Sequence, residues 1–200
     1  METSGINWLP MPEQLCTVEE YLKFERASEA RHEYLNGKIR LVHGGSGNHS
    51  IIIGSTLAAL HTQLRKSSCE AYVVQMRLLV SSTGLYTYPD LTVVCDKPQF
   101  VHQDTLLNPT LIVEVLSSES AAYDRGKKFY HYRHLESLQE CVLIEQDSPY
   151  IEHYVRQSDD QWLLSDHAGL GAVVELPSIG CTLALADVYE KVTFEEEESS

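Results

Sequence analysis

The chain has 200 residues and is 43% apolar, which suits one domain with a sizeable core and makes a second full domain improbable. Its formal charge of −14 argues against a protein that coats nucleic acid non-specifically, because such affinity comes chiefly from Lys and Arg at phosphates. Removing the four tail acids Glu195 to Glu198 changes −14 only to −10. We therefore expect at most a confined basic surface.

The organisation along the chain predicts three parts: an irregular leader (1–16), a single domain (17–194) and a disordered acidic tail (195–200). No basic segment leads into an apolar run, and no stretch is long enough to span a bilayer, so we expect a cytoplasmic protein without membrane contact. Its five cysteines are scattered and form no CxxC pair. This pattern predicts core cysteines rather than a disulfide framework or a zinc site.

The first predicted elements are a helix and a hairpin. Thr17 and Glu20 have the spacing of a capping box, which predicts a helix from there to about Ala27. Asn36-Gly37 between two short β-like runs (33–35 and 38–42) predicts a tight hairpin. The glycine-rich stretch that follows (44–47) lacks the Lys-Ser/Thr of a P-loop, so it gives little support for a phosphate cradle.

A long core helix and a long strand are predicted next. Apolar residues keep helical spacing from Asn48 to about Lys66. Alternation over 71–80 predicts one strand, with Gln75 and Arg77 on the face that would look toward a site.

Two further strand-like runs each carry one acid. Asp90 follows a proline at the start of the first run (88–94), and Glu114 lies within the second (111–116). Alternation places Glu114 on the same strand face as Ile112 and Leu116, where an apolar side chain would be expected. A carboxylate removed from water must be neutralised, hydrogen-bonded, paired with a cation or bound to a metal, so this acid needs a partner.

The rest of the chain predicts a second helix at 121–135, further strands, and a short closing helix at 185–189. The further strands are expected at 141–145, 150–156, 162–165 and 172–175. Two long helices among many strands, without regular βαβ alternation, indicate an α/β (α+β) domain with a central mixed β-sheet flanked by helices.

Asp90 after a proline, a strand, and then a strand with Glu114 resembles the PD-(D/E)XK, restriction-endonuclease-like superfamily. The continuation Glu114-Val115-Leu116-Ser117-Ser118, followed by Asp124-Arg125-Gly126-Lys127-Lys128 and Tyr130, more narrowly resembles the Uma-type family of proposed endonucleases. This resemblance covers roughly 17–145. It implies hydrolysis of phosphodiester bonds in DNA, with Mg²⁺ (or Mn²⁺ as a substitute) held by Asp90, Glu114 and the Val115 carbonyl, and a homodimer that cuts two strands.

The chain departs from the superfamily at its most diagnostic residue, because Leu116 occupies the position of the lysine two residues after the strand acid. The Uma-type pattern implies that the following helix supplies this lysine, with Lys128 as the better match and Lys127 as the reserve. An alternative is that Asp124 and Lys128 form an i,i+4 ion pair on a solvated helix face.

Each of the other candidates has a structural alternative. Glu33 matches an acidic motif of the family but could be a surface hairpin acid, and His49 matches a family position but could be a cap or core histidine. Gln75 could bond the acids or serve as a cross-strand partner. Asp90 could be a turn residue, and Glu114 could pair with Arg77 or a lysine.

Two other functions stay open. The fold could be a catalytically silent binding or regulatory module, which Leu116 and the acidic charge favour, or a phosphohydrolase for a small ligand. A closed pocket would favour the small ligand. An open cleft lined by Arg125, Lys127, Lys128 or Arg133 would favour DNA.

Overall fold

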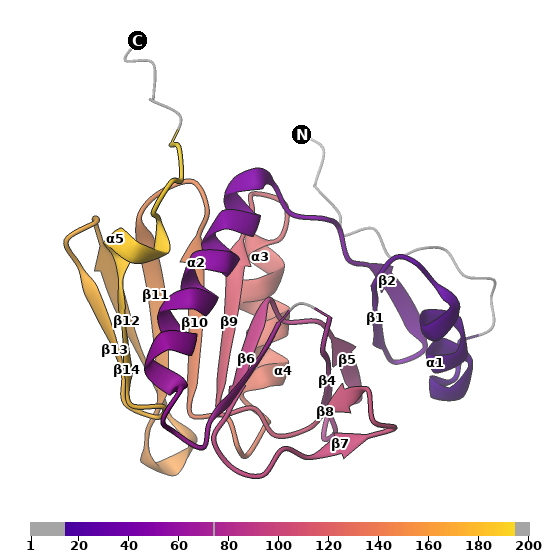
Figure 1. The fold of residues 1–200 in the computed structure, drawn as a ribbon. Coiled ribbons are helices and arrows are strands. Elements are labelled where there is room, and N and C mark those ends of the chain that lie inside the picture. Colours follow the sequence, from indigo (N-terminus) through magenta and orange to yellow (C-terminus); the bar gives the residue numbers. More distant parts are fainter. Residues whose placement is uncertain (1–14, 74, 195–200) are drawn as a thin grey trace.

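The computed structural model describes residues 15–73 and 75–194, so most of the expected leader and the whole expected tail lie outside the described residues. Figure 1 shows a central sheet with α2 across one face and α3–α4 behind the other, while α1 and the β1–β2 hairpin form a lobe at one side. Within the described ranges, no helix has the length and apolar content needed to cross a membrane.

The lobe contains the first two predicted elements. Helix α1 (Val18–Ala27) begins with the expected capping box, in which Thr17 accepts a hydrogen bond from the Glu20 amide and the Glu20 carboxylate accepts one from Thr17. Strands β1 (His32–Leu35) and β2 (Lys38–Leu41) form the expected hairpin. Asn36 (φ 49°) and Gly37 (φ 81°) adopt the left-handed conformation that this turn requires.

The central sheet has six strands in the order β12-β11-β10-β9-β6-β3. It is mixed, because β9 and β10 run parallel while the other neighbours run antiparallel. These strands are β3 (Glu70–Val73), β6 (Leu91–Val94), β9 (Leu111–Leu116), β10 (Glu140–Glu145), β11 (Tyr150–Arg156) and β12 (Trp162–Ala168). All six residues of β9 are buried, which explains its continuous apolar run.

The prediction of one strand over 71–80 is wrong. The chain turns after β3, where the Met76 amide donates to the Val73 carbonyl, and it then enters a second sheet of order β2-β1-β5-β4-β8-β7. That sheet adds β4 (Arg77–Val80), β5 (Leu85–Thr87), β7 (Phe100–Val101) and β8 (Thr105–Leu106). The alternation of apolar residues continues through the turn, so the sequence pattern alone does not reveal the change of sheet.

Different elements cover the two faces of the central sheet. One face packs against α2 (Gly47–Leu64), α5 (Leu185–Val188) and the β13–β14 hairpin (Val173–Leu176 and Cys181–Ala184). The other face packs against a continuous helical segment made of α3 (Ala121–Tyr123), a π-helical turn η1 (Asp124–Lys128) and α4 (Phe129–Tyr132). A short 3₁₀ turn, η2 (Ser158–Asp160), links β11 to β12.

The cysteine prediction needs a correction. Cys69 and Cys95 form a disulfide. Cys69 directly precedes Glu70 and Cys95 directly follows Val94, so the antiparallel pairing of Glu70 with Val94 places the two cysteines opposite each other. The three free cysteines, Cys16, Cys141 and Cys181, are buried, as expected for core residues. The sequence spacing of the cysteines did not indicate this bridge, because the distance between Cys69 and Cys95 depends on which strands pair.

Candidate active site

The two predicted acids lie on neighbouring strands. Leu91 in β6 is opposite Val113 in β9, so Asp90, directly before β6, comes opposite Glu114. The Asp90 Oδ2 atom accepts a hydrogen bond of 2.7 Å from the Val115 amide, which fixes this carboxylate against β9. Glu114 is 3% exposed and Asp90 is 9% exposed. The sheet therefore brings two nearly buried acids together at one place.

Glu114 faces the helical segment, and its Oε1 atom is held from there by two donors. The Lys128 ammonium lies 3.1 Å from Oε1, and the Tyr132 hydroxyl donates to the same atom at 2.5 Å. An ammonium from the helical segment thus lies beside Glu114, although position 116 of the strand is a leucine. Lys128 is itself buried, whereas Lys127 is exposed, so the geometry favours Lys128 over the reserve candidate.

A third acid, Asp124, belongs to the same cluster and is absent from our sequence-based list of site residues. It is 3% exposed, and its Oδ1 atom lies 3.1 Å from the Lys128 ammonium. The i,i+4 pair that we considered thus exists, but it is buried rather than on a solvated face. Asp124, Lys128 and Tyr132 are spaced four residues apart, and this spacing is the sequence signal that could have identified Asp124 and Tyr132.

The π-helical turn explains how this spacing keeps one direction. In an α-helix, residues four apart drift by about 40° around the axis, so a third residue would begin to leave the face. The π-turn spans Asp124–Lys128 and, being wider, rotates less per residue than an α-helix. The α-helical turn of α4 then connects Lys128 to Tyr132. The two kinds of turn compensate, and all three side chains reach toward the sheet.

Glu33 is an interior residue of the site rather than a surface hairpin acid. It is 2% exposed, and its Oε1 atom accepts from the Thr87 hydroxyl at 2.5 Å and lies 3.6 Å from the Lys128 ammonium. Its Oε2 atom accepts from the Tyr123 hydroxyl at 2.9 Å and from Arg40 at 3.4 Å. Strand β1 thus adds a third carboxylate near the Lys128 ammonium, besides those of Glu114 and Asp124.

His49 lies on the Asp90 side. Its backbone amide donates to the Ser46 hydroxyl at the start of α2, as a helix cap requires, while its ring Nε2 atom is 3.4 Å from Asp90 Oδ2. Burial opposes the charged form of the ring, but the Asp90 carboxylate and the Val115 carbonyl overcome this and raise the pKa of His49. The His49 ring therefore lies next to the Asp90 carboxylate and the Val115 carbonyl.

The protonation of the cluster follows from burial and charge. Burial, with added repulsion from Asp124 and Asp90, raises the pKa of Glu114 to about 8, even though Lys128 and Tyr132 favour the carboxylate. Burial opposes the charged form of Lys128, but Asp124 and Glu114 raise its pKa well above the ordinary value. Glu114 thus binds a proton readily, while Lys128 stays cationic.

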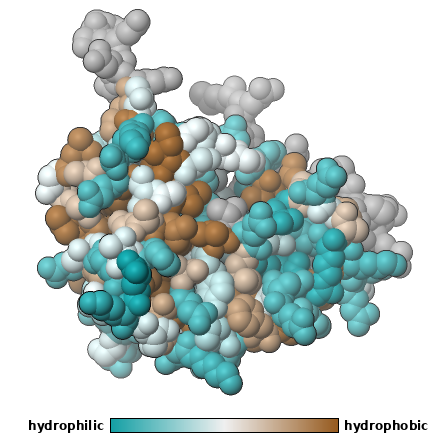
Figure 2. All heavy atoms as spheres, in the orientation of Figure 1, coloured by the Kyte–Doolittle hydropathy of each residue, from teal (hydrophilic) through white to brown (hydrophobic). Residues whose placement is uncertain are grey.

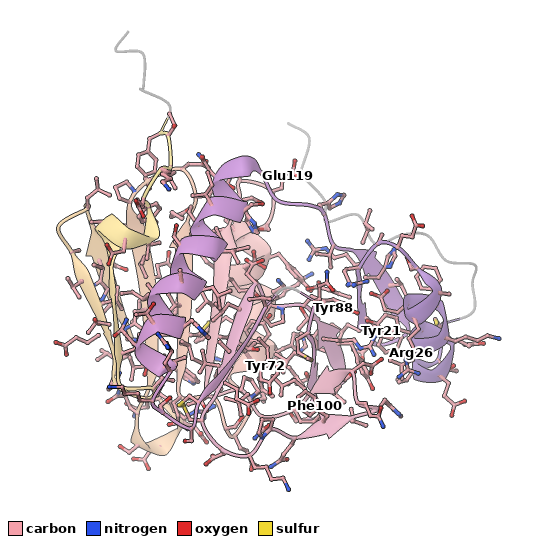
Figure 3. All side chains as sticks on the ribbon, in the orientation of Figure 1. Tyr21, Arg26, Tyr72, Tyr88, Phe100 and Glu119 are labelled. Carbon is pink, nitrogen blue, oxygen red and sulfur yellow. A yellow bond between two sulfur atoms is a disulfide. The ribbon has the colours of Figure 1, made fainter. Side chains whose placement is uncertain are left out.

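Two predicted residues lie elsewhere. Gln75 is exposed in the turn after β3, and Arg77 is buried with Thr105 (2.9 Å), Tyr88 (3.3 Å) and Asp104 (2.8 Å) instead of the site acids. Figure 3 shows Tyr21 and Tyr88 on the side of the molecule where this network joins the α1 lobe. The expectation that Gln75 and Arg77 face the site is therefore wrong, because it assumed a single unbroken strand.

The donor set suits a hard divalent cation. Among the described residues, no side chain or amide donates to Asp90 Oδ1 or Glu114 Oε2, and the Val115 carbonyl adds a third oxygen nearby. Mg²⁺ prefers one or two carboxylates supplemented by other oxygens. Over 15–73 and 75–194, no three His, Cys, Asp or Glu side chains group tightly enough to hold a metal, so the carbonyl is part of the fit.

Two surface hollows lie along the outer face of α2, both bordered by Gly54 and Ala58, and the site acids line neither of them. Figure 2 shows apolar side chains gathered over this central part of the molecule, whereas hydrophilic side chains cover the α1 lobe. These hollows therefore give no support to a closed pocket for a small ligand at the acids.

The architecture defines a restriction-endonuclease-like fold. A solved structure described as a "putative nuclease belonging to DUF820", from Anabaena variabilis ATCC 29413, matches with a TM-score of 0.72 at 20% sequence identity. The match covers 88% of this chain and 99% of that one. It confirms the predicted fold class.

The family follows from the sequence matches. The model of the Uma2 family, described as "Putative restriction endonuclease", matches residues 18–186. Two uncharacterized proteins of Synechocystis sp. (strain ATCC 27184 / PCC 6803 / Kazusa) are each 35% identical, with 81% and 92% of this chain and 93% and 96% of theirs covered. The chain belongs to the Uma2 family, and the match extends beyond Glu145, where we expected the resemblance to end.

Proposed function

We propose that this protein is a divalent-metal-dependent endonuclease that hydrolyses phosphodiester bonds in DNA. The observation that carries the proposal is the position of the Lys128 ammonium, 3.1 Å from Glu114 and within a cluster of buried acids, despite the leucine at position 116. In the superfamily, the lysine two residues after the strand acid would provide a cation beside that acid, and Lys128 provides one here. Its presence argues against a silent module, which the substitution at Leu116 alone would suggest.

In this proposal, Asp90, Glu114 and the Val115 carbonyl hold Mg²⁺, with Mn²⁺ as a substitute. The bound ion would lower the pKa of a water nucleophile and offset charge on the phosphate. The two carboxylates are suited to this task because protein donors engage one oxygen of each, Asp90 Oδ2 and Glu114 Oε1. The other oxygen of each carboxylate could then bind the ion without breaking a hydrogen bond to the protein.

The chain's own groups would act around the attacking water. Lys128 would orient the water and stabilise negative charge that develops in the transition state, since an ammonium in a buried site acts more strongly than one in solvent. Tyr132 would keep Glu114 oriented from the same side. Glu33 would hold the ammonium from β1, and His49 would support Asp90.

The acidic charge bears on how DNA would bind. With a formal charge of −14, the protein lacks the general attraction to phosphates that most DNA-binding proteins use, so binding would depend on the ion and a few local cations. We propose a homodimer as the form that cuts two strands. Light scattering of the purified protein tests this, and a monomer at working concentration would contradict it.

The main test measures cleavage of single-stranded, duplex and branched DNA with and without Mg²⁺ or Mn²⁺. We expect metal-dependent cleavage that Glu114→Gln and Asp90→Asn abolish and that Asp147→Asn, at an exposed acid, leaves intact. Mn²⁺ should also raise the melting temperature of the wild type but not of Glu114→Gln. Absence of cleavage on all three substrates, with the Mn²⁺ shift retained, would favour the silent-module alternative.

A further inference from the structure

The Lys128 ammonium contacts three carboxylates, and these differ in how many other partners they have. Glu114 also accepts from Tyr132, and Glu33 also accepts from Thr87, Tyr123 and Arg40. Asp124 Oδ1 is buried, and among the described residues it has no hydrogen-bond partner besides the ion pair with Lys128. Among the described residues, the Asp124 Oδ1 atom thus has the ammonium alone as its partner, whereas Glu33 and Glu114 also accept hydrogen bonds from other groups.

This difference matters when a divalent cation binds. The ion would draw on the negative charge of Glu114 and would repel an ammonium that lies 3.1 Å from the same carboxylate. Glu33 is farther, at 3.6 Å, and its charge is already shared with Arg40. Among the three carboxylates described near the ammonium, Asp124 combines a 3.1 Å contact with an Oδ1 atom that has no other described partner. Asp124 and Lys128 both belong to the π-helical turn, which fixes their separation.

We propose that Asp124 is a positioning residue that keeps the Lys128 ammonium in place when the Glu114 carboxylate binds the catalytic cation. The inference rests on the proposed function, and it adds a role that operates through Lys128 and not through the metal. Asp124 is thus distinguished from Asp90 and Glu114: its removal should impair the reaction while leaving the cation site intact.

The neighbouring Arg125 shows what a purely structural ion pair in this turn looks like. Its guanidinium contacts Glu145 and Glu152 on β10 and β11, at the partly exposed outer side of the turn. These contacts tie the turn to the sheet without Asp124. Neutralising Asp124 should therefore leave the backbone of the turn in place, which makes the substitution informative about Lys128.

The kinetic test is a double-mutant cycle with Asp124→Asn, Lys128→Ala and their combination, with Asp147→Asn as the matched control. We expect Asp124→Asn to lower kcat by between about tenfold and a hundredfold, with KM and the calorimetric affinity for Mn²⁺ within about twofold of wild type. The double variant should be no slower than Lys128→Ala. Unchanged kcat, a loss of Mn²⁺ affinity, or additive effects would each overturn the proposal.

A second measurement needs no cleavage activity, so it separates this proposal from the failure of the proposed function. Lysine labelling by reductive methylation, followed by mass spectrometry, should modify Lys128 slowly in Mn²⁺-loaded wild type and several-fold faster in Asp124→Asn. The exposed Lys127 should be modified at the same rate in both. Equal protection of Lys128 in the two proteins would refute the role of Asp124.

If Asp124→Asn does not fold, Asp124→Glu replaces it in both experiments, because it keeps the charge but displaces the carboxylate. Lower kcat with unchanged Mn²⁺ affinity, and faster labelling of Lys128, would support the proposal. Wild-type values for both would overturn it.

Discussion

The two faces of the central sheet bury very different side chains. On the α2 face, Val113, Val115 and Val142 pack against Ile52 and Leu60 in an apolar core. On the other face, alternate residues of the same strand β9 include Glu114, which accepts hydrogen bonds from a buried lysine and a buried tyrosine. One strand thus contributes to a hydrophobic core through one set of residues and to a charged cluster through the other.

The two faces contribute differently to the stability of the fold and to the chemistry of the candidate site. Apolar burial stabilises the fold by about 25 cal/mol per Å² removed from water, and the α2 face is built of such contacts. Buried ion pairs often contribute little net stability, because desolvation opposes the attraction between the charges. The cluster around Glu114 is therefore better explained by a function than by a need for stability.

The largest effect is expected from Lys128→Met. It should lower kcat by about 10²- to 10³-fold, as loss of a charge-stabilising donor does, and should also destabilise the fold by about 3–5 kcal/mol because buried acids lose their counter-ion. Single-turnover cleavage and urea unfolding measure the two effects. Lys127→Met, at the exposed neighbour, should change neither, and the opposite ranking would assign the catalytic lysine to position 127.

Leu60→Ala tests the apolar face. The fully buried side chain packs in the α2 core, so its truncation should lower the free energy of unfolding by about 2–5 kcal/mol while kcat per folded molecule stays unchanged. Ile51→Ala, on the exposed side of the same helix, is the matched control and should have little effect. A large fall in kcat at Leu60→Ala would show that the two faces are not separable.

The Cys69–Cys95 disulfide predicts a redox-dependent stability. The two cysteines are separated by 26 positions in the sequence, so in the chain-entropy model reduction of the bond should lower the free energy of unfolding by about 3.5 kcal/mol. Urea unfolding with and without dithiothreitol measures this, and Cys69→Ser should remove the difference. Identical curves for the wild type in both conditions would mean that the bond contributes nothing to stability.

The smallest effect is a pH dependence of the metal-free protein. The folded-state pKa of Glu114 is raised to about 8 by burial, from an ordinary value of 4.5, so between these pH values the folded state holds a proton that the unfolded state releases. Stability should therefore fall as pH rises through this window. Melting curves should show a shallower slope for Glu114→Gln, and equal slopes would contradict the assignment.

Much of the fold could be predicted because its signals are local. The capping box at Thr17, the Asn36-Gly37 turn and the helical periodicity after Asn48 each depend on nearby residues, and each element is present. The prediction of one strand over residues 71–80 is wrong for the opposite reason, because the change of sheet depends on distant contacts. Local alternation predicts extended backbone, but a turn stabilised by a single hydrogen bond from Met76 sends the two halves into different sheets.

In the candidate site, too, the features with a local sequence signal could be predicted and those that depend on packing could not. Asp90 and Glu114 stand out in sequence because acids within apolar strands are unusual, and the pairing of β6 with β9 places them beside each other. Asp124 was overlooked, because an acid and a lysine four residues apart occur on many solvated helices. Its burial depends on how the helical segment docks on the sheet, which sequence spacing does not reveal.

The π-helical turn makes this site sensitive to chain length as well as to residue type. Gly126 lies at the middle of the turn, and we expect its deletion to convert this wider turn into an ordinary α-helical one. On that α-helix, Asp124 and Lys128 would be three residues apart and about 60° from each other around the axis, whereas Lys128 and Tyr132 would keep their spacing of four residues. A relative with every site residue but one residue fewer in this turn would thus keep Lys128 and Tyr132 together and change the direction of Asp124 relative to them.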